Sequence, residues 1–410
     1  MRVVFSRRYA MAIAMASVAF AAPALAQTKD KNVKIGVLND MSSLYADIGG
    51  PNSVVAAKMA VEDSGLAKKG WTIDVISADH QNKPDIGANI ARQWYDIDKV
   101  DMITDTPNSG VALAVSNVSK EKNGILMNSG GASADLTGKQ CTPNTISMTY
   151  DTYMLAHGTG AAMTKAGGKT WFFLTSDYAF GHALERDTTA VINANGGKVV
   201  GSVRHPLNTP DFSSFLLQAQ ASKANVIGLA NAGGDTTNAI KQAAEFGIVQ
   251  GGQKLAALLL FINDVHSLGL KTAQGLTFTV SYYWDHNDQG RAFAKRFQER
   301  ARNHEMPSMT QAGVYAAVLH YLKTLEQMGG NPHDGKMVVA EMKKLPTDDP
   351  VFGKGSIRED GRAMHPAFLY EVKKPSESKG AWDYFKLISE IPADQVAVPL
   401  GESTCPLIKK

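Results

Sequence analysis

Short apolar runs of strand length alternate with amphipathic segments of helix length along most of this sequence. The alternation is repeated four times before residue 130 and starts again after residue 150. Because parallel strands are joined by crossovers, usually helices, this order predicts parallel sheets with helices on both faces. Strands are predicted at residues 33–38, 71–76, 102–104, 125–128, 171–175, 199–203, 226–230, 255–261 and 276–281, and helices at 51–63, 84–95, 109–122, 152–165, 181–194, 211–221, 235–246, 289–303 and 309–328.

Two series of strand–helix units predict an α/β chain with two lobes, each a mainly parallel sheet flanked by helices. We expect residues 27–149 with 279–355 in the first lobe, and residues 150–278 with 356–410 in the second. Residues 368–372 and 382–388 alternate apolar and polar side chains, which is typical of an antiparallel hairpin. The chain is therefore expected to pass between the lobes more than once.

The first 26 residues have the features of a cleaved export signal. Three arginines precede an apolar run at residues 10–22, and Ala24-Leu25-Ala26 supplies the small residues of a signal-peptidase site. The apolar run is shorter than the ~20 residues that span a bilayer, so it predicts export rather than anchoring. The paired arginines at positions 7 and 8 fit a twin-arginine signal as well as an ordinary secretory one. We expect a periplasmic protein.

The charge of the mature chain argues against two classes of partner. The 42 basic and 39 acidic residues leave a formal charge of +3, and the three arginines of the leader account for all of it, since 3 − 3 = 0. Proteins that bind nucleic acids or anionic membranes carry basic patches, which this neutral, interleaved pattern does not predict. We expect no nucleic-acid partner and no direct membrane insertion.

Two cysteines, Cys141 and Cys405, are the whole cysteine content of the chain. In an oxidising compartment an even number of cysteines favours a disulfide, which here would tie the C-terminal tail to the middle of the sequence. Closing so long a loop stabilises a fold by roughly 4–5 kcal/mol in the chain-entropy model. A cysteine-based metal site is not expected.

Sequence motifs of the common α/β enzymes are missing. The first predicted strand is followed by Asn39-Asp40-Met41-Ser42-Ser43 rather than by the glycine-rich turn that binds dinucleotides. The sequence contains no phosphate-binding P-loop, no zinc-protease motif and no nucleophile elbow, and its ten histidines lack ligand spacing. We expect no cofactor, no metal and no enzymatic activity.

Polar loops follow the predicted strands instead. Ligands of open α/β sheets bind at the carboxyl ends of the strands, where helix N-termini present free N–H groups. Ordinary capping of helices by serine and asparagine is the alternative explanation for any single loop. In the first lobe these loops are 41–45, 106–110 and 129–133, and in the second they are 177–181, 231–234 and 262–264.

The segments 35–45, 109–115 and 129–133, with the turn from Tyr178 to Gly181, resemble those of the branched-chain amino-acid-type periplasmic binding proteins of ABC importers. The resemblance extends over nearly the whole mature chain. It implies a type I periplasmic-binding fold, with two lobes joined by three crossovers and a ligand held between them. It also implies a membrane permease as the partner and hinge closure as the mechanism.

The resemblance assigns roles to particular residues. It implies that Ser109, Ala132 and Ser133 hold the carboxylate of the ligand and that Tyr178 approaches from the second lobe. Family members that bind amino acids use two acidic residues for the ammonium group, and the matching positions are Asp151 and Asn263-Asp264. The full set of predicted ligand-binding residues is Ser43, Tyr45, Ser109, Ser129, Gly131, Ala132, Ser133, Asp151, Tyr153, Tyr178, Asn231, Asn263 and Asp264.

The loop at residues 261–267 departs from the family pattern, because it lacks the glycine and glutamate typical of amino-acid binders. This loop and the segment 282–285 are more similar to those of members that bind aromatic carboxylic acids. We therefore favour a small aromatic carboxylate over a branched-chain amino acid as the ligand. We expect the protein to be a monomeric subunit of the importer. A ligand-sensing receptor subunit is one alternative, and a secreted hydrolase with Ser129 or Ser133 as nucleophile is another.

Overall fold

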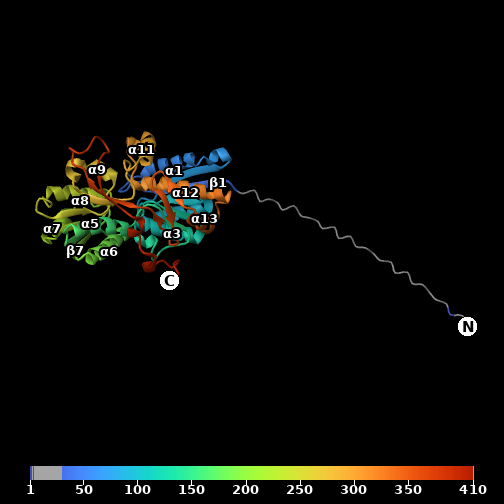
Figure 1. The fold of residues 1–410 in the computed structure, drawn as a ribbon, viewed down its shortest axis with the longest axis horizontal. Helices are drawn as coiled ribbons and strands as arrows, with labels where there is room; N and C mark the ends of the chain where they lie inside the picture. Colours follow the sequence, from blue (N-terminus) through green and yellow to red (C-terminus); the bar gives the residue numbers. More distant parts are fainter. Residues whose placement is uncertain (2, 4–29, 410) are drawn as a thin grey trace.

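The computed structural model describes residues 1, 3 and 30–409, which include two α/β lobes joined by a hinge (Figure 1). The export signal expected at residues 1–26 lies outside the described residues, except for Met1 and Val3. In the part of the chain that is described, no helix is long and apolar enough to cross a membrane.

The first lobe is built on a sheet of five parallel strands in the order β2-β1-β3-β4-β5. Successive residues of a strand face opposite sides of a sheet, and here Met102 and Ile103 belong to two separate hydrophobic clusters, one on each side. The strands are β1 (Asn32–Asn39), β2 (Thr72–Asp79), β3 (Met102–Asp105), β4 (Ile125–Asn128) and β5 (Thr145–Ser147). The flanking helices are α1 (Gly50–Ser64), α2 (Pro84–Gln93), α3 (Ser109–Lys122), α12 (Met309–Met328) and α13 (Gly335–Lys344).

The second lobe repeats this plan with four parallel strands in the order β7-β6-β8-β9. Its strands are β6 (Thr170–Ser176), β7 (Lys198–His205), β8 (Val226–Ala230) and β9 (Lys254–Ala257). Its helices are α4 (Thr152–Leu155), the π-helical turn η4 (Ala156–Gly160), α5 (Ala161–Lys165), α6 (Ala179–Ala194), α7 (Ser213–Ala221), α8 (Gly234–Glu245), α9 (Ile262–Leu268) and α10 (Leu270–Ala273). Figure 1 shows α5 to α8 at one end of the molecule and α1, α3, α12 and α13 at the other.

Antiparallel strands complete each lobe. Beside β9, the sheet β10-β14-β15 consists of β10 (Thr277–Val280), β14 (Ala367–Val372) and β15 (Phe385–Ile391). Against α12 and α13 of the first lobe lies the sheet β11-β12-β13, made of β11 (Thr347–Asp349), β12 (Gly353–Ile357) and β13 (Ala363–Met364). The chain thus crosses between the lobes three times, after β5, after β10 and between β13 and β14.

Shorter elements connect these parts. Helix α11 (Asp288–Arg300) packs on α1, and Arg296 binds Asp63 across that contact at 2.7 Å. The remaining short helices are η1 (Leu66–Lys69), η2 (Trp94–Asp98), η3 (Ala134–Leu136), η5 (Arg302–His304), η6 (Ala393–Gln395) and η7 (Leu400–Glu402).

The predicted two-lobed α/β architecture and the antiparallel pairing near the C-terminus are confirmed. Most predicted elements differ from the observed ones by a few residues at their ends, and two of the differences bear on the crevice or the hinge. The strand expected at 255–261 ends at Ala257. Phe261 is instead the N-cap of α9, and its N–H donates to the Asp264 carboxylate at 2.9 Å. The helix expected at 152–165 is divided by the π-helical turn η4, which includes Gly158 and Gly160.

The predicted disulfide between Cys141 and Cys405 is present, with the two Cα atoms 5.5 Å apart. Cys141 lies in the first lobe between η3 and β5, whereas the tail that carries Cys405 follows β15 of the second lobe. The bond therefore fastens the end of the chain across the hinge to the opposite lobe. Figure 1 places this C-terminal end beneath α3.

Removing the disulfide should destabilise the protein strongly. The bond closes a loop with a sequence separation of 264 residues, and the chain-entropy model assigns such a loop about 5 kcal/mol. We expect Cys141→Ser/Cys405→Ser to lower the free energy of unfolding by up to this amount, measured by urea denaturation of the mature chain. Equal denaturation midpoints for the variant and the oxidised wild type would contradict the expectation.

Candidate ligand-binding site

A small cavity between the lobes, called the inner cavity here, is enclosed by the loops that follow the parallel strands. In each sheet the strand order reverses beside the first strand, between β1 and β3 and between β6 and β8. Loops diverge at such a point and leave a crevice at the carboxyl ends of the strands. The residues that line the cavity are Tyr45, Ile48, Pro107, Gly130, Ala132, Tyr150, Tyr178, Phe180, Ala232, Leu259 and Phe261.

The lining is aromatic and uncharged. Five of its eleven residues are tyrosine or phenylalanine, and none is acidic or basic. Tyr150, on the first crossover, donates its hydroxyl hydrogen to the Gly130 carbonyl oxygen at 2.8 Å. Its ring packs edge to face on the Phe261 ring, with the ring centres 6.2 Å apart. The cavity is therefore suited to a flat apolar group rather than to a charged one.

The lobes are closed over this cavity. The hydroxyl groups of Tyr45 and Tyr178 lie 2.6 Å apart across the gap, and Arg186 of the second lobe binds Asp135 of the first at 3.1 Å. The remaining volume is about 10 Å³, which is roughly the space of one water molecule. A larger ligand can enter only when the lobes separate.

Ser109 joins two loops of the first lobe beneath the cavity. Asn108 caps α3 by accepting from the N–H groups of Gly110 and Val111. The next residue, Ser109, accepts through its Oγ from the N–H groups of Ala132 and Ser133, both at 3.1 Å. These two N–H groups, predicted to hold a carboxylate, are occupied by the serine hydroxyl in the closed structure.

Hydrogen bonds and close packing fix the loop that carries Gly130 and Ala132. The Asn128 side chain accepts from the Gly131 N–H and donates to the Gly131 carbonyl, and a Cβ atom on Gly131 would lie 2.6 Å from Ala112. The Ser129 and Gly130 N–H groups donate to the Asp105 carbonyl. Burial raises the pKa of the Asp105 carboxyl to about 7. The loop is thus positioned by hydrogen bonds to the Asn128 side chain and the Asp105 backbone carbonyl, and by close packing.

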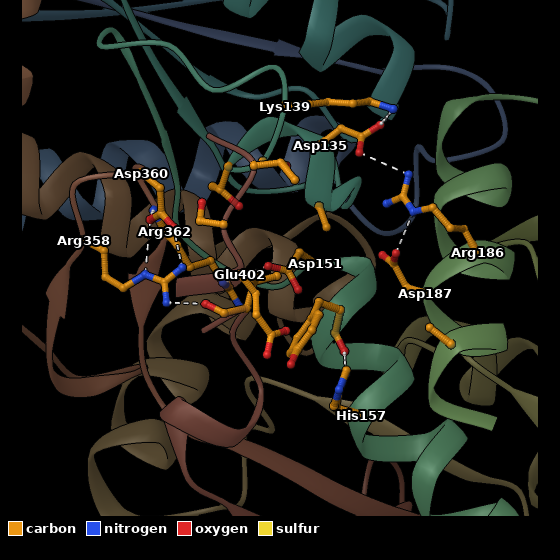
Figure 2. Close-up of a pocket in the computed structure, with 18 residues that line it drawn as sticks. Asp135, Lys139, Asp151, His157, Arg186, Asp187, Arg358, Asp360, Arg362 and Glu402 are labelled. Atoms are coloured by element: carbon orange, nitrogen blue, oxygen red, sulfur yellow. Dashed lines mark hydrogen bonds and ion pairs between the residues drawn. The ribbon is translucent and has the colours of Figure 1, made fainter. Parts of the chain in front are cut away.

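Asp151 and Tyr153 lie in a different cavity, on the hinge side, with a volume of about 390 Å³ (Figure 2). Figure 2 shows Asp135, Arg186 and Asp187 on one side of this hinge cavity and Arg358, Asp360 and Arg362 on the other.

Both residues have structural partners there. Asp151 caps α4 through the Met154 N–H and binds Arg362 at 3.0 Å, with both side chains almost fully buried. Tyr153 stacks on His157 with ring centres 3.7 Å apart. The structure therefore does not bring these two residues to the inner cavity.

The other predicted residues of the second lobe are divided between a buried network and an outer cavity at the mouth of the crevice. Asn231 is fully buried. Its side chain contacts the His205 ring and accepts a hydrogen bond from the Thr236 hydroxyl. Asn263 and Asp264 line the outer cavity together with Ser43 of the first lobe. Burial raises the pKa of Asp264 to about 7, although the Phe261 N–H opposes this shift.

Of the predicted set, Tyr45, Ala132 and Tyr178 line the inner cavity directly. Sequence reasoning missed the other members, since it selected mainly polar residues in the predicted loops. The available signal was that most of these residues lie in loops that directly follow a strand, where ligands of parallel sheets bind. The missed residues are Ile48, Pro107, Gly130, Tyr150, Phe180, Ala232, Leu259 and Phe261. Within the described part of the chain, no group of three or more His, Cys, Asp or Glu residues is arranged to hold a metal ion.

Residues 32–381 match the family model described as periplasmic binding protein. The chain belongs to this family. A crystal structure of a periplasmic binding protein from Burkholderia mallei is 52% identical, with a TM-score of 0.89, over 92% of this chain and 100% of that one. The match confirms the predicted type I fold.

Two other solved structures show the same fold. A branched-chain amino acid ABC transporter periplasmic ligand-binding protein from Burkholderia xenovorans is 40% identical with a TM-score of 0.81, over 92% of this chain and 100% of that one. A solute-binding protein from R. palustris in complex with benzoate is 21% identical, with a TM-score of 0.80, over 92% of this chain and 99% of that one. As a periplasmic binding protein of ABC transporters, the chain binds a small molecule and works with a membrane permease.

Closure over the inner cavity should depend on the glycine at position 233. Gly233 has a φ of +56°, and a Cβ atom there would lie 3.0 Å from the Leu44 carbonyl and 3.2 Å from the Tyr45 ring on the opposite lobe. We expect Gly233→Ala to favour the open form, seen as a larger radius of gyration in small-angle X-ray scattering.

Gly196→Ala is the matched control, because Gly196 also has a positive φ of +72° but nothing lies within 4 Å of its Cβ position. Both substitutions strain the backbone, whereas only the first introduces a clash between lobes. Equal radii for the two variants would contradict the role of Gly233 in closure.

Asp151 should contribute to stability rather than to ligand affinity. Asp151→Asn keeps a capping side chain on α4 but leaves Arg362 buried without its ion-pair partner, which typically costs about 3–5 kcal/mol. We expect a lower urea midpoint, and Asp151→Asn/Arg362→Met should recover much of the loss. A normal midpoint with weakened ligand binding would instead place Asp151 in the binding site.

Proposed function

We propose that this protein is the importer subunit that captures a small aromatic carboxylate in the inner cavity. The observation that carries the proposal is the lining: five aromatic rings from both lobes surround a space without a charged side chain. Aromatic pairs prefer edge-to-face and offset contacts with rings about 4.5–7 Å apart, which this lining offers to a benzene ring. The benzoate complex of the R. palustris protein has the same fold.

The acidic side chains near the crevice give little support to an α-amino ligand. A buried ammonium group needs a paired carboxylate. Asp151 is bound to Arg362 on the hinge side, and Asp264 accepts from the Phe261 N–H outside the inner cavity. A neutral or anionic ligand therefore suits the inner cavity better than a zwitterion does.

A branched-chain amino acid is the second candidate. The outer cavity brings the carboxylates of Asp47 and Asp264 towards one another, and Asp47 raises the pKa of Asp264 further. An ammonium group reaching this mouth would relieve that repulsion. The Burkholderia xenovorans relative is described as a branched-chain amino acid transporter protein.

The arrangement of Ser129 and Ser133 supports binding without catalysis. Ser129 Oγ lies 3.5 Å from Thr104 Oγ1, and Ser133 Oγ accepts from the Asp135 N–H. Among the residues that the structure describes, neither hydroxyl is hydrogen-bonded to a histidine, the usual general base of a serine nucleophile. These contacts favour an importer subunit over a hydrolase. A sensor role shares the same site and differs only in the partner.

In the proposed cycle, export through the leader at residues 1–26 places the mature protein in the periplasm. The open form admits the ligand at the carboxyl ends of β1, β3 and β4. Closure then adds Tyr178, Phe180 and Phe261 from the second lobe, and the ligand favours the closed state by contacting both lobes. The closed monomer docks on the permease.

Thermal unfolding of the mature protein tests the cargo. A ligand present at a thousand times its dissociation constant adds about 4 kcal/mol of stability, which corresponds to a rise of several degrees in Tm. We expect a rise with benzoate or a hydroxybenzoate and none with leucine or valine. A rise with leucine alone would establish the amino-acid alternative, and hydrolysis of a test ester abolished by Ser129→Ala would overturn the non-catalytic role.

A further inference from the structure

Asp105, the last residue of β3, is a completely buried carboxyl group without a cationic partner. Its Oδ2 accepts a hydrogen bond from the Asn39 side chain at the end of β1. Its Oδ1 is buried and has no hydrogen-bond partner among the described residues. An ionised carboxylate in this place would be an unpaired buried charge, which proteins avoid by keeping the group protonated.

The groups packed around this carboxyl are neutral. Asn39 on β1 and Ser53 on α1 both lower the pKa of Asp105, but burial outweighs them and raises it to about 7. On β4 the residue paired with Asp105 is Asn128, and the first turn of α12, the helix packed on β3, has no titratable side chain. Tyr150 on the first crossover also faces it, and burial, with a smaller effect of Asp105, raises the pKa of this phenol. No described neighbour therefore supplies a positive charge.

A second buried carboxylate near the crevice shows the contrast. Asp40, directly after β1, is also completely buried, but its oxygens accept from the Ser43 and Tyr45 N–H groups and from the Asn82 side chain. Donors of this kind stabilise the charged form of a carboxylate. The hydrogen bond from Asn39 gives Asp105 much less of this stabilisation.

Asp105 is in contact with both loops that are predicted to hold the carboxylate of the cargo. The loop 106–110 begins directly after it, and its carbonyl accepts from the Ser129 and Gly130 N–H groups of the loop 129–133. A Cβ atom on Gly130 would lie 3.1 Å from Asp105 Oδ1, and Gly130 lines the inner cavity. An anion held by these loops would be separated from the unpartnered oxygen by little more than the Gly130 backbone.

The backbone at this point is strained. Asp105 and Thr106 have φ values of +84° and +54°, a left-handed conformation that is uncommon for residues other than glycine and rare for a β-branched one. Such strain persists where the surrounding contacts fix it, and it is concentrated at functional sites. The contacts here are the two hydrogen bonds from the loop 129–133 to the Asp105 carbonyl. They hold the buried carboxyl group against the loop.

We infer that Asp105 is a specificity-determining residue: the loops after β3 and β4 hold the anionic group of the cargo only while Asp105 carries its proton. The inference rests on the proposed function. An ionised Asp105 and a bound carboxylate would be like charges at close range, which disfavours the charged form of each. Where the free protein has lost the proton, capture of one anion therefore takes up one proton, and the affinity for the cargo falls as the pH rises.

Calorimetric titration of the mature protein with benzoate tests the inference. Benzoate is ionised from about pH 6 to about pH 9, so its own charge stays constant over this range. We expect the wild-type dissociation constant to rise by up to about tenfold for each pH unit above about pH 7, because the proton has to be taken up again. In Asp105→Asn the side chain is neutral at every pH, and the dissociation constant should not change.

The proton can also be counted in the wild type alone, so the test does not depend on the folding of a variant. At about pH 8, titrations in two buffers with different heats of ionisation should give different apparent heats of binding. The difference should correspond to about one proton taken up for each benzoate bound. Asp105→Asn should show no difference between the buffers.

Two variants serve as controls. Asp101, at the amino end of the same strand, is also buried with a raised pKa, but it binds His333 at 2.8 Å. Asp101→Asn should keep the pH dependence of the wild type. Asp264 at the mouth of the crevice has a pKa that burial raises to about 7. If Asp264→Asn abolishes the dependence and Asp105→Asn keeps it, the inference is overturned.

Urea denaturation without ligand tests the proton on Asp105 independently of the cargo. Its folded pKa is raised above the model value of 3.8, so the stability that the proton confers is complete below this value and is lost as the pH rises towards about 7. The wild type should therefore lose stability relative to Asp105→Asn over this range. Parallel midpoints of the two proteins would overturn the inference.

Failure of the inference and failure of the proposed function have different signatures. Equal benzoate affinity of the wild type at about pH 6 and about pH 9, without proton uptake, overturns the inference and leaves the cargo class intact. If the wild type binds neither benzoate nor a hydroxybenzoate at any pH, the proposed function fails, and the inference fails with it.

Discussion

The contact between Tyr45 and Tyr178 defines the closed state on which the other features of the crevice depend. It forms because the loops after β1 and β6 both emerge beside the reversal of strand order in their sheets. The two parallel sheets face one another at these points, so the loops after β1 and β6 come into contact. No charged pair in the inner cavity is needed to hold them together. The inner cavity remains aromatic and neutral, which is the basis of the proposed cargo.

Charged residues are concentrated on the hinge side instead. Asp151 lies on the first crossover and Arg362 lies just before the third, so their buried ion pair connects two of the three chain crossings. Buried ion pairs contribute little net stability, but losing one partner is costly. We therefore interpret the pair as a constraint on hinge geometry. The disulfide adds a further connection by fastening the tail of the second lobe to the first.

Much of the candidate site could be predicted because carboxyl ends of parallel strands meet at one edge of a sheet. This rule identified the loops that carry Tyr45, Ala132 and Tyr178. It did not distinguish Asp151, whose partner Arg362 is more than two hundred residues away in sequence. The predicted strand 255–261 also included Phe261, although this apolar residue is the N-cap of α9 and lines the cavity. An apolar residue near a strand end has the same local pattern whether it faces a core or a ligand.

The sequence by itself determined the two series of strand–helix units, the polar loops that follow the strands and the pair of cysteines available for a disulfide. These features follow from local periodicity and composition, which a single chain displays directly. The tertiary structure alone decided which side chains share a cavity. It paired Tyr45 with Tyr178, engaged the Ala132 and Ser133 N–H groups with Ser109, and directed Asp151 to Arg362. Such contacts join residues that are distant in sequence, so they depend on how the two lobes pack and close.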